Sequence, residues 1–358
     1  MLKIALVTGV NDCYKNYKFN FHKNSSTEFN KSQSFNILDH DNLFIETLHK
    51  GIKNIGANID HVENYSSIDE IDVFFYIGFS RNHEKKYIND FKNKLFFLYI
   101  NEPPAIIPEQ WTKKTHQYFD KIFINNKKYL DNKKYVYVNG ITVVSKNFKL
   151  SFKKKKYFSV FFATNMPLNH QLSLYKNKID LINFFEEYYP EKLHLYGRNW
   201  DLNFFYKIKF FMIFNKIITI IKKLKIQSLF FKKKRIFKGF EKNKMQKISE
   251  YKFDFALENS VSDGFITGRI FHSFFAGTVP IYLGSKNIEN YIPKNTFIDF
   301  RKYISIKLLY AYLSGMSDKI YNNYIINIKK FVKSKRFKLF TLEYDVGIII
   351  KEICKIKI

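Results

Sequence analysis

Short apolar runs separated by amphipathic stretches recur along this chain and predict an α/β protein. Residues 253–257 are apolar with a single charge, which is typical of a buried strand. A loop with Gly264 and Gly268 follows, then helical spacing of apolar residues over 269–276, then a second apolar run over 279–283. Strand, loop, helix and strand in this order form the unit of a parallel α/β sheet.

The first half of the chain shows the same alternation. The residues after Asp39-His40-Asp41 have helical spacing up to Gly56, so Asp39 or Asp41 is expected to cap that helix. A D-x-D metal site is the alternative, but the amphipathic spacing favours the cap. Strands are predicted at residues 2–8, 58–62, 71–78, 94–100, 119–125 and 135–139.

The second half continues with predicted strands at 158–163 and 193–197 and helices at 171–187, 242–250, 306–314 and 318–334. We divide the chain into an N-terminal α/β domain, a basic linker, a C-terminal domain and a final segment that packs back on both domains. Their limits are 1–145, 146–156, 157–335 and 336–358.

Residues 201–238 differ from the rest of the C-terminal domain and are treated as an insertion. Between 210 and 225, large apolar residues fall on one helical face and polar or basic residues on the other, and a cluster from Lys232 to Arg235 follows. This pattern suits contact with an anionic membrane surface. A helix packed on its own domain is the alternative.

The loop at residues 258–269 is the candidate site. Ligands of parallel α/β sheets bind beyond the carboxyl ends of the strands, and this loop lies there. The helix after it offers free N–H groups and a partial positive charge, and Arg269 adds a fork of donors suited to a diphosphate. The pattern therefore predicts a site for a phosphorylated ligand, with an ordinary crossover and a surface arginine as the alternative.

The same stretch resembles the donor-binding signature of the family 10 α-1,3-fucosyltransferases. Many matches in one order are far more specific than a single glycine motif. The resemblance is firm over residues 190–335 and looser over 102–110. The matching segments are Tyr251-Lys252-Phe253, Leu257-Glu258-Asn259, Phe265-Ile266-Thr267 and Ala276-Gly277-Thr278-Val279-Pro280-Ile281-Tyr282-Leu283-Gly284, together with 195–200, 290–293 and 297–299.

The resemblance implies a GT-B arrangement, in which two Rossmann-like domains face each other across a cleft, the acceptor-side domain first and the donor-binding domain second. It implies inverting transfer of fucose from GDP-fucose to a hydroxyl of a surface glycan, such as lipopolysaccharide O-antigen, most simply with an α-1,3 link. No metal or other cofactor is implied, and the chain resembles the soluble bacterial members. The implied donor-binding residues are Lys178, Glu258, Asn259, Phe265, Thr267 and Arg269.

Two positions qualify this assignment. The family's Thr-Glu-Lys is Thr267-Gly268-Arg269 here, so the charge is kept but a Glu thought to bind hydroxyls of the nucleotide sugar is lost. Another nucleotide sugar, or a catalytically silent nucleotide- or glycan-binding protein, therefore remains an alternative. Lys178, better placed than Lys176, stands where the family tends to have an arginine, and a solvated lysine is the alternative for each.

Glu102 is the candidate catalytic base. It follows the predicted strand at 94–100 and precedes Pro103-Pro104, which restrict the backbone just after the acid. The family has a Glu-Pro-Pro element at the matching place, and inverting transfer needs a base that takes the proton of the acceptor hydroxyl. A carboxylate that braces the loop or caps a helix is the alternative.

The length, composition and charge of the chain limit the classes of partner that it could bind. The chain has 358 residues, 46% of them hydrophobic, and a formal charge of +28, so it is long enough for two folded domains. The lysines are spread along the chain without a nucleic-acid module, which favours a phosphorylated substrate or an anionic membrane over nucleic acid.

The cysteine count and the hydropathy predict the compartment. Cys13 and Cys354 stand alone and fit a reducing compartment. No stretch approaches about twenty uncharged apolar residues, and the N-terminus lacks a secretory pattern. We therefore expect a cytoplasmic protein, with peripheral contact at the inner face of the membrane if the acceptor is lipid-linked.

Overall fold

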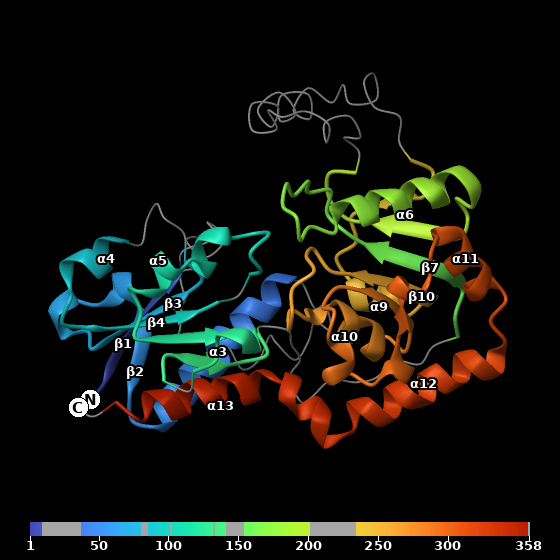
Figure 1. The fold of residues 1–358 in the computed structure, drawn as a ribbon. Coiled ribbons are helices and arrows are strands. Elements are labelled where there is room, and N and C mark those ends of the chain that lie inside the picture. The colour runs from blue at the N-terminus through green and yellow to red at the C-terminus, as the bar shows by residue number, and fades with distance from the viewer. Residues whose placement is uncertain are drawn as a thin grey trace.

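The computed structural model describes residues 1–8, 37–79, 85–100, 102–131, 133–140, 154–200 and 234–356. Within these residues two parallel sheets stand side by side, each with helices on its faces (Figure 1). The α/β fold class predicted from the apolar pattern is confirmed. The domain limits given above remain predictions.

The N-terminal sheet has the strand order β2-β1-β3-β4-β5-β6, and every neighbouring pair is parallel. Along β3, Val73 and Phe75 enter one core cluster while Phe74 and Tyr76 enter another on the opposite face. Burial on both faces explains the unbroken apolar run of this strand. The strands are β1 (Lys3–Thr8), β2 (Asn58–His61), β3 (Val73–Ile77), β4 (Leu95–Tyr99), β5 (Lys121–Ile124) and β6 (Tyr135–Tyr137).

The helices of this half are α3 (Ile37–Asn54), α4 (Lys85–Asp90) and α5 (Lys113–His116). Because α3 already begins at Ile37, Asp39 and Asp41 lie inside the helix, and the prediction that one of them is its N-cap is wrong. The apolar period starts earlier than we expected, since Ile37 stands two helical turns before Phe44. Gly56 follows the helix end with a φ of 73°, as the stop at this position predicts.

The C-terminal sheet has the order β12-β11-β10-β7-β8-β9, again with parallel neighbours. Its strands are β7 (Tyr157–Phe162), β8 (Leu193–Tyr196), β9 (Phe237–Gly239), β10 (Tyr251–Leu257), β11 (Val279–Leu283) and β12 (Ile298–Asp299). Its helices are α6 (Tyr175–Tyr188), α9 (Lys244–Ile248), α10 (Gly268–Phe275), α11 (Ile306–Ser314) and α12 (Asp318–Val332).

Two predictions in this half need correction. Helix α6 begins at Tyr175 and not at residue 171, because the preceding residues form a turn in which the Ser173 N–H donates to the His170 carbonyl. The end of the predicted insertion contributes the edge strand β9, which pairs with β8 and which the pattern did not predict. The amphipathic helix expected at 210–225 lies outside the described residues.

The last segment joins the two halves. The 3₁₀ helix η8 (Lys335–Phe340) leads into α13 (Leu342–Ile353), which runs back beneath the N-terminal sheet (Figure 1). One core cluster includes Val346 and Ile349 of α13, Phe44 of α3 and Phe271 of α10. The two sheets thus share a hydrophobic core, which holds the carboxyl edge of the first against the loops of the second.

A tight backbone contact fixes how those edges meet. Gly264, in the loop after β10, has a φ of 76°, and a Cβ atom there would collide with the backbone oxygen of Asn125, which follows β5. Lys128 pairs with Asp263 across the same boundary, at 3.0 Å between Nζ and Oδ2. The candidate loop therefore lies against the carboxyl edge of the N-terminal sheet.

Candidate active site

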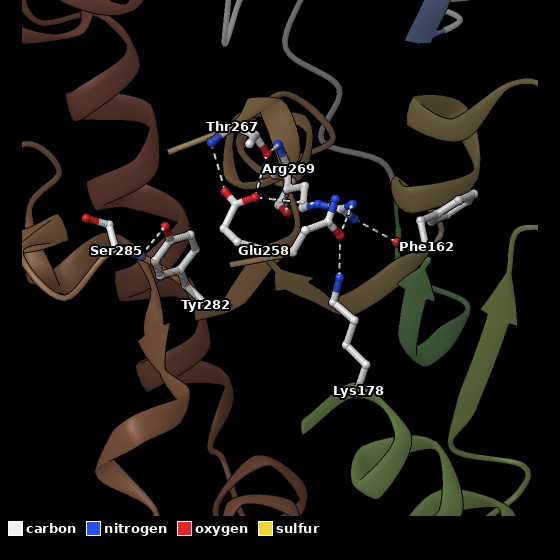
Figure 2. A network of polar contacts seen from close by, with 9 residues as sticks. Phe162, Lys178, Glu258, Thr267, Arg269, Tyr282 and Ser285 are labelled. Carbon is white, nitrogen blue, oxygen red and sulfur yellow. Dashed lines mark hydrogen bonds and ion pairs between the residues drawn. The ribbon is translucent and has the colours of Figure 1, made fainter. Parts of the chain in front are cut away.

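The candidate loop is closed by a buried carboxylate. Glu258 follows the last residue of β10 and has no exposed surface. Its Oε1 accepts from the Thr267 N–H at 2.8 Å and its Oε2 from the Thr267 hydroxyl at 2.8 Å (Figure 2). Thr267 is in turn the N-cap of α10, since its hydroxyl accepts from the Arg269 N–H at 3.3 Å. Glu258 therefore sets where helix α10 begins, which is where an anion would bind.

Arg269 is held against the ends of two neighbouring strands. Its Nη1 donates to the carbonyl of Phe162, the last residue of β7, at 3.0 Å, and its Nη2 donates to Asn259 Oδ1 at 3.4 Å. Its Nε lies 3.6 Å from Glu258 Oε2 (Figure 2). These contacts fix the guanidinium at the carboxyl edge of the sheet, where the sequence placed it.

Lys178 comes to the same point from α6. Its side chain is only 4% exposed, and its Nζ donates to Asn259 Oδ1 at 2.6 Å. Burial, with Arg269 nearby, lowers the pKa of this ammonium group well below its usual value. The alternative of a solvated lysine is wrong for Lys178, while Lys176 is exposed and pairs with Asp180 at 2.6 Å.

The sequence analysis missed Lys244, the first residue of α9. Its Nζ lies 5.5 Å from the centroid of the Phe162 ring, whose backbone carbonyl accepts from Arg269. Burial, with Arg269 nearby, lowers the pKa of Lys244 to about 8. Lys244 precedes the signature, and no spacing of residues along the chain indicates that it belongs to the site. The pairing of β7 with β10 brings it there.

A second buried carboxylate lies behind Arg269. Asp254 on β10 is 4% exposed and accepts from the Ser273 hydroxyl at 2.7 Å. Burial raises the pKa of this carboxyl to about 6, although the nearby Lys244 works in the opposite direction. The Asp254 side chain ties β10 to α10 and so supports the position of Arg269.

Three cations from three different helices thus converge on one edge of the sheet. Burial, and after it the repulsion from the nearby Arg269, lowers the pKa of both Lys178 and Lys244, although the Glu258 carboxylate works in the opposite direction. A negatively charged group placed among them, at the N-terminus of α10, would relieve that repulsion. The arrangement is suited to a phosphate or diphosphate.

Asn259 and Phe265, the remaining predicted donor-binding residues, and the neighbouring Tyr282 also lie around the candidate loop. Asn259 accepts from Lys178 and Arg269 and so joins two of the cations, and the Phe265 side chain is 7% exposed within the loop. Tyr282 of β11 is buried and accepts from the Ser285 N–H at 3.1 Å (Figure 2). Among the described residues, no group of three or more His, Cys, Asp or Glu side chains could hold a metal ion.

Glu102 lies on the other half of the molecule, after β4. Its backbone carbonyl accepts from Gln110 Nε2 at 2.8 Å and from Trp111 Nε1 at 2.9 Å, so two side chains brace its main chain. The neighbouring strand β5 leads to Asn125, which contacts Gly264 of the candidate loop. Glu102 thus lies at the carboxyl edge of the N-terminal sheet, after the strand next to β5, and its role as a base stays a prediction.

The arrangement of the two sheets identifies the fold class of the protein. Two parallel α/β sheets that meet at their carboxyl edges form the GT-B fold of glycosyltransferases, as the resemblance implied. Solved structures with this fold cover the whole chain: an α1,3-fucosyltransferase in complex with GDP has a TM-score of 0.53 at 15% identity and is covered over 91% of its length. Anabaena Alr3699/HepE in complex with UDP-glucose has a TM-score of 0.55 at 8% identity, with 99% of this chain and 100% of that chain covered.

A family model matches the C-terminal part of the chain. Residues 213–356 match the model of glycosyltransferase family 10 (fucosyltransferase), C-terminal part. The resemblance drawn from the motifs is confirmed.

Curated relatives match a part of the chain. Arabidopsis thaliana α-(1,4)-fucosyltransferase is 35% identical over 71 residues, which are 20% of this chain and 18% of that protein. Human 4-galactosyl-N-acetylglucosaminide 3-α-L-fucosyltransferase 9 is 35% identical over 105 residues, 26% of this chain and 29% of that protein. The chain therefore spans less than a third of the length of these relatives.

Proposed function

We propose that this protein is an inverting glycosyltransferase that transfers fucose from GDP-fucose to a hydroxyl of a glycan and forms an α-1,3 link. The observation that carries the proposal is the convergence of Lys178 and Lys244 on Arg269, which stands at the N-terminus of α10 inside the family's signature. The family match and the names of the fucosyltransferase relatives support fucose as the sugar.

In the proposed reaction, the carboxylate of Glu102 takes the proton of the acceptor hydroxyl. The freed oxygen attacks the anomeric carbon of fucose while the bond from that carbon to the β-phosphate oxygen breaks, and GDP leaves with the electron pair. The cation cluster and the N-terminus of α10 stabilise the charge that develops on the diphosphate. Basic side chains and a helix terminus would then do the work that a divalent cation does in other transferases.

The proposed acceptor is a surface glycan such as lipopolysaccharide O-antigen, in free or lipid-linked form. The formal charge of +28 and the basic pattern of residues 201–238 support contact with an anionic membrane, and we propose a cytoplasmic location at its inner face. No helix in the described part of the chain is long and apolar enough to cross a membrane.

Another nucleotide sugar is the second candidate donor, and Gly268 is the observation that favours it. This residue begins α10, where the family has a Glu. The fold is also compatible with a uridine nucleotide, since Alr3699/HepE, whose fold is similar, was solved with UDP-glucose. A catalytically silent binding protein is the third candidate.

A thermal-shift series with GDP, GDP-fucose, GDP-mannose, UDP and UDP-glucose separates these candidates. We expect stabilisation by GDP and GDP-fucose, and release of GDP when a glycan acceptor is added to GDP-fucose. Stabilisation by UDP or UDP-glucose alone would overturn the donor, and binding of GDP-fucose without turnover on any acceptor would favour the silent protein. The Arg269→Gln variant is the matched control, because it should lose the shift for every diphosphate.

A further inference from the structure

The three cations of the site differ in whether their donors are already in use. Arg269 donates to Phe162 and Asn259, and Lys178 donates to Asn259. Lys244, by contrast, has no acceptor within hydrogen-bond reach among the described residues, and its ammonium group lies over the face of the Phe162 ring. The ammonium group of Lys244 is therefore available for a ligand in a way that the other two are not.

The position of Lys244 also suits an anion. Phe162 ends β7, and Arg269 donates to its carbonyl while Lys244 lies over its ring, so the two cations flank one strand end. Apart from Arg269, the charged groups that face Lys244 are Asp254 and Glu258, both on or directly after β10. Asp254 Oδ2 accepts from Ser273 and the two Glu258 oxygens accept from Thr267, and among the described residues neither carboxylate forms a hydrogen bond or an ion pair with Lys244.

We infer that Lys244 donates directly to the diphosphate of the nucleotide sugar and is the main lysine ligand of the site. This inference rests on the proposed function only in assuming a diphosphate ligand. Lys178 then acts as a positioning residue, since its Nζ holds Asn259 and, through it, Arg269.

The test uses Lys244→Met in the full chain, with Lys247→Met as the matched control. Lys247 stands on the same short helix and is already paired with Glu250 at 3.3 Å. Binding of GDP, UDP, inorganic pyrophosphate and guanosine is measured by calorimetry at pH 7. We expect Lys244→Met to weaken diphosphate binding about 10- to 100-fold, as for loss of hydrogen bonds to a charged group, and to leave guanosine binding unchanged.

Two further readouts separate a ligand from a structural lysine. Removal of a partly buried ammonium group that has no hydrogen-bond acceptor among the described residues should raise the melting temperature of the unliganded Lys244→Met variant, whereas loss of a structural contact would lower it. In the wild type, GDP binding should weaken as the pH rises above about 8. Lys244 loses its proton in the unliganded protein at that pH, and it must take the proton up again when it binds the diphosphate. Lys244→Arg cannot lose its proton and should bind GDP with a flatter pH dependence.

The outcomes distinguish this inference from the proposed function. Equal affinity of the wild type and Lys244→Met for GDP and pyrophosphate would overturn the inference and leave the function standing. Binding of UDP but not GDP, lost in Lys244→Met, would overturn the donor and support the inference. No binding of any diphosphate by the wild type would overturn both.

Discussion

Gly284 lies directly against the side chain of Glu258. A Cβ atom at Gly284 would stand 2.5 Å from Glu258 Cγ, and it would also collide with the hydroxyl of Tyr282. The glycine that closes the signature is therefore required because it leaves room for the carboxylate that organises the candidate loop. Two motif positions far apart in the sequence meet at one point, since β10 and β11 are neighbouring strands.

Gly284→Ala should displace Glu258 and impair both folding and binding. Overpacking of a filled core costs about 1–3 kcal/mol, and any displacement of Glu258 would also move Thr267 and Arg269. We expect a lower melting temperature and weaker GDP binding. Gly347→Ala in α13 is the control, because nothing lies within 4 Å of its Cβ position, and it should be neutral or stabilising. Unchanged GDP affinity in a folded Gly284→Ala variant would contradict the role of Glu258 in the loop.

Gly268→Glu should strengthen the use of GDP-fucose. A Glu at the first residue of α10 restores the family's residue and also suits the positive end of the helix. We expect kcat/KM with GDP-fucose to rise about tenfold, as for one hydrogen bond to a charged group. Gly268→Ala is the control for helix propensity alone. If Glu lowers activity while Ala does not, the pocket is shaped around the glycine and the donor is a different sugar.

Glu102→Gln should abolish transfer without loss of donor binding. A positioned general base contributes about 10²- to 10⁴-fold to the rate, and the amide keeps the shape of the side chain but takes up no proton. Steady-state kinetics and GDP calorimetry measure the two properties separately. Glu109→Gln, in the 3₁₀ helix that follows the same loop, is the control and should remain active. A Glu102→Gln variant with wild-type kcat would remove Glu102 as the base.

Lys178→Met should weaken GDP binding, whereas Lys176→Met should not. Loss of the Lys178 ammonium leaves Asn259 Oδ1 with Arg269 as its one side-chain donor among the described residues, at 3.4 Å, and loosens the guanidinium. Lys176 is exposed, and its pair with Asp180 contributes little to stability. Calorimetry of both variants with GDP is the measurement. Equal loss in the two would show that only the net charge of α6 matters.

Asp345 should make stability depend on pH. This residue of α13 is 3% exposed and accepts from the Asn139 N–H at 3.0 Å and the Tyr99 hydroxyl at 3.4 Å. Burial raises its pKa from 3.8 to about 7, so the folded protein keeps the proton over a range where the unfolded chain has lost it. The contribution of the protonated acid is therefore complete below about pH 4 and is lost as the pH rises to 7.

Asp345→Asn removes this titration. We expect the variant to be more stable than the wild type at pH 8, with an advantage that shrinks as the pH falls toward 5. Thermal melts at several pH values measure the difference, and Asp318→Asn, at an exposed carboxylate, is the control. Parallel curves for the wild type and Asp345→Asn would exclude a raised pKa.

Much of the architecture could be predicted because strands and helices each impose a characteristic period on the apolar residues of the chain. The runs that became β3 and β4 are packed on both faces and are therefore apolar throughout. The signature could also be identified from the sequence, because Glu258, Thr267 and Arg269 lie close together in one loop and in the first turn of the helix that follows it. The wrong predictions concern the start of α3 and the short edge strand β9. In both places too few residues are available to show a hydrophobic period.

The sequence by itself determined the α/β class, the resemblance to the family 10 fucosyltransferases and the loop that carries Glu258, Thr267 and Arg269, since all of these depend on residues close together in the chain. Only the tertiary structure decided that Lys178 is buried on Asn259, that Lys244 joins Arg269 at the end of β7, and that Gly264 meets Asn125. These relationships depend on which strands are neighbours and on how the two sheets dock. That order is set by packing across the whole chain, which no local pattern encodes.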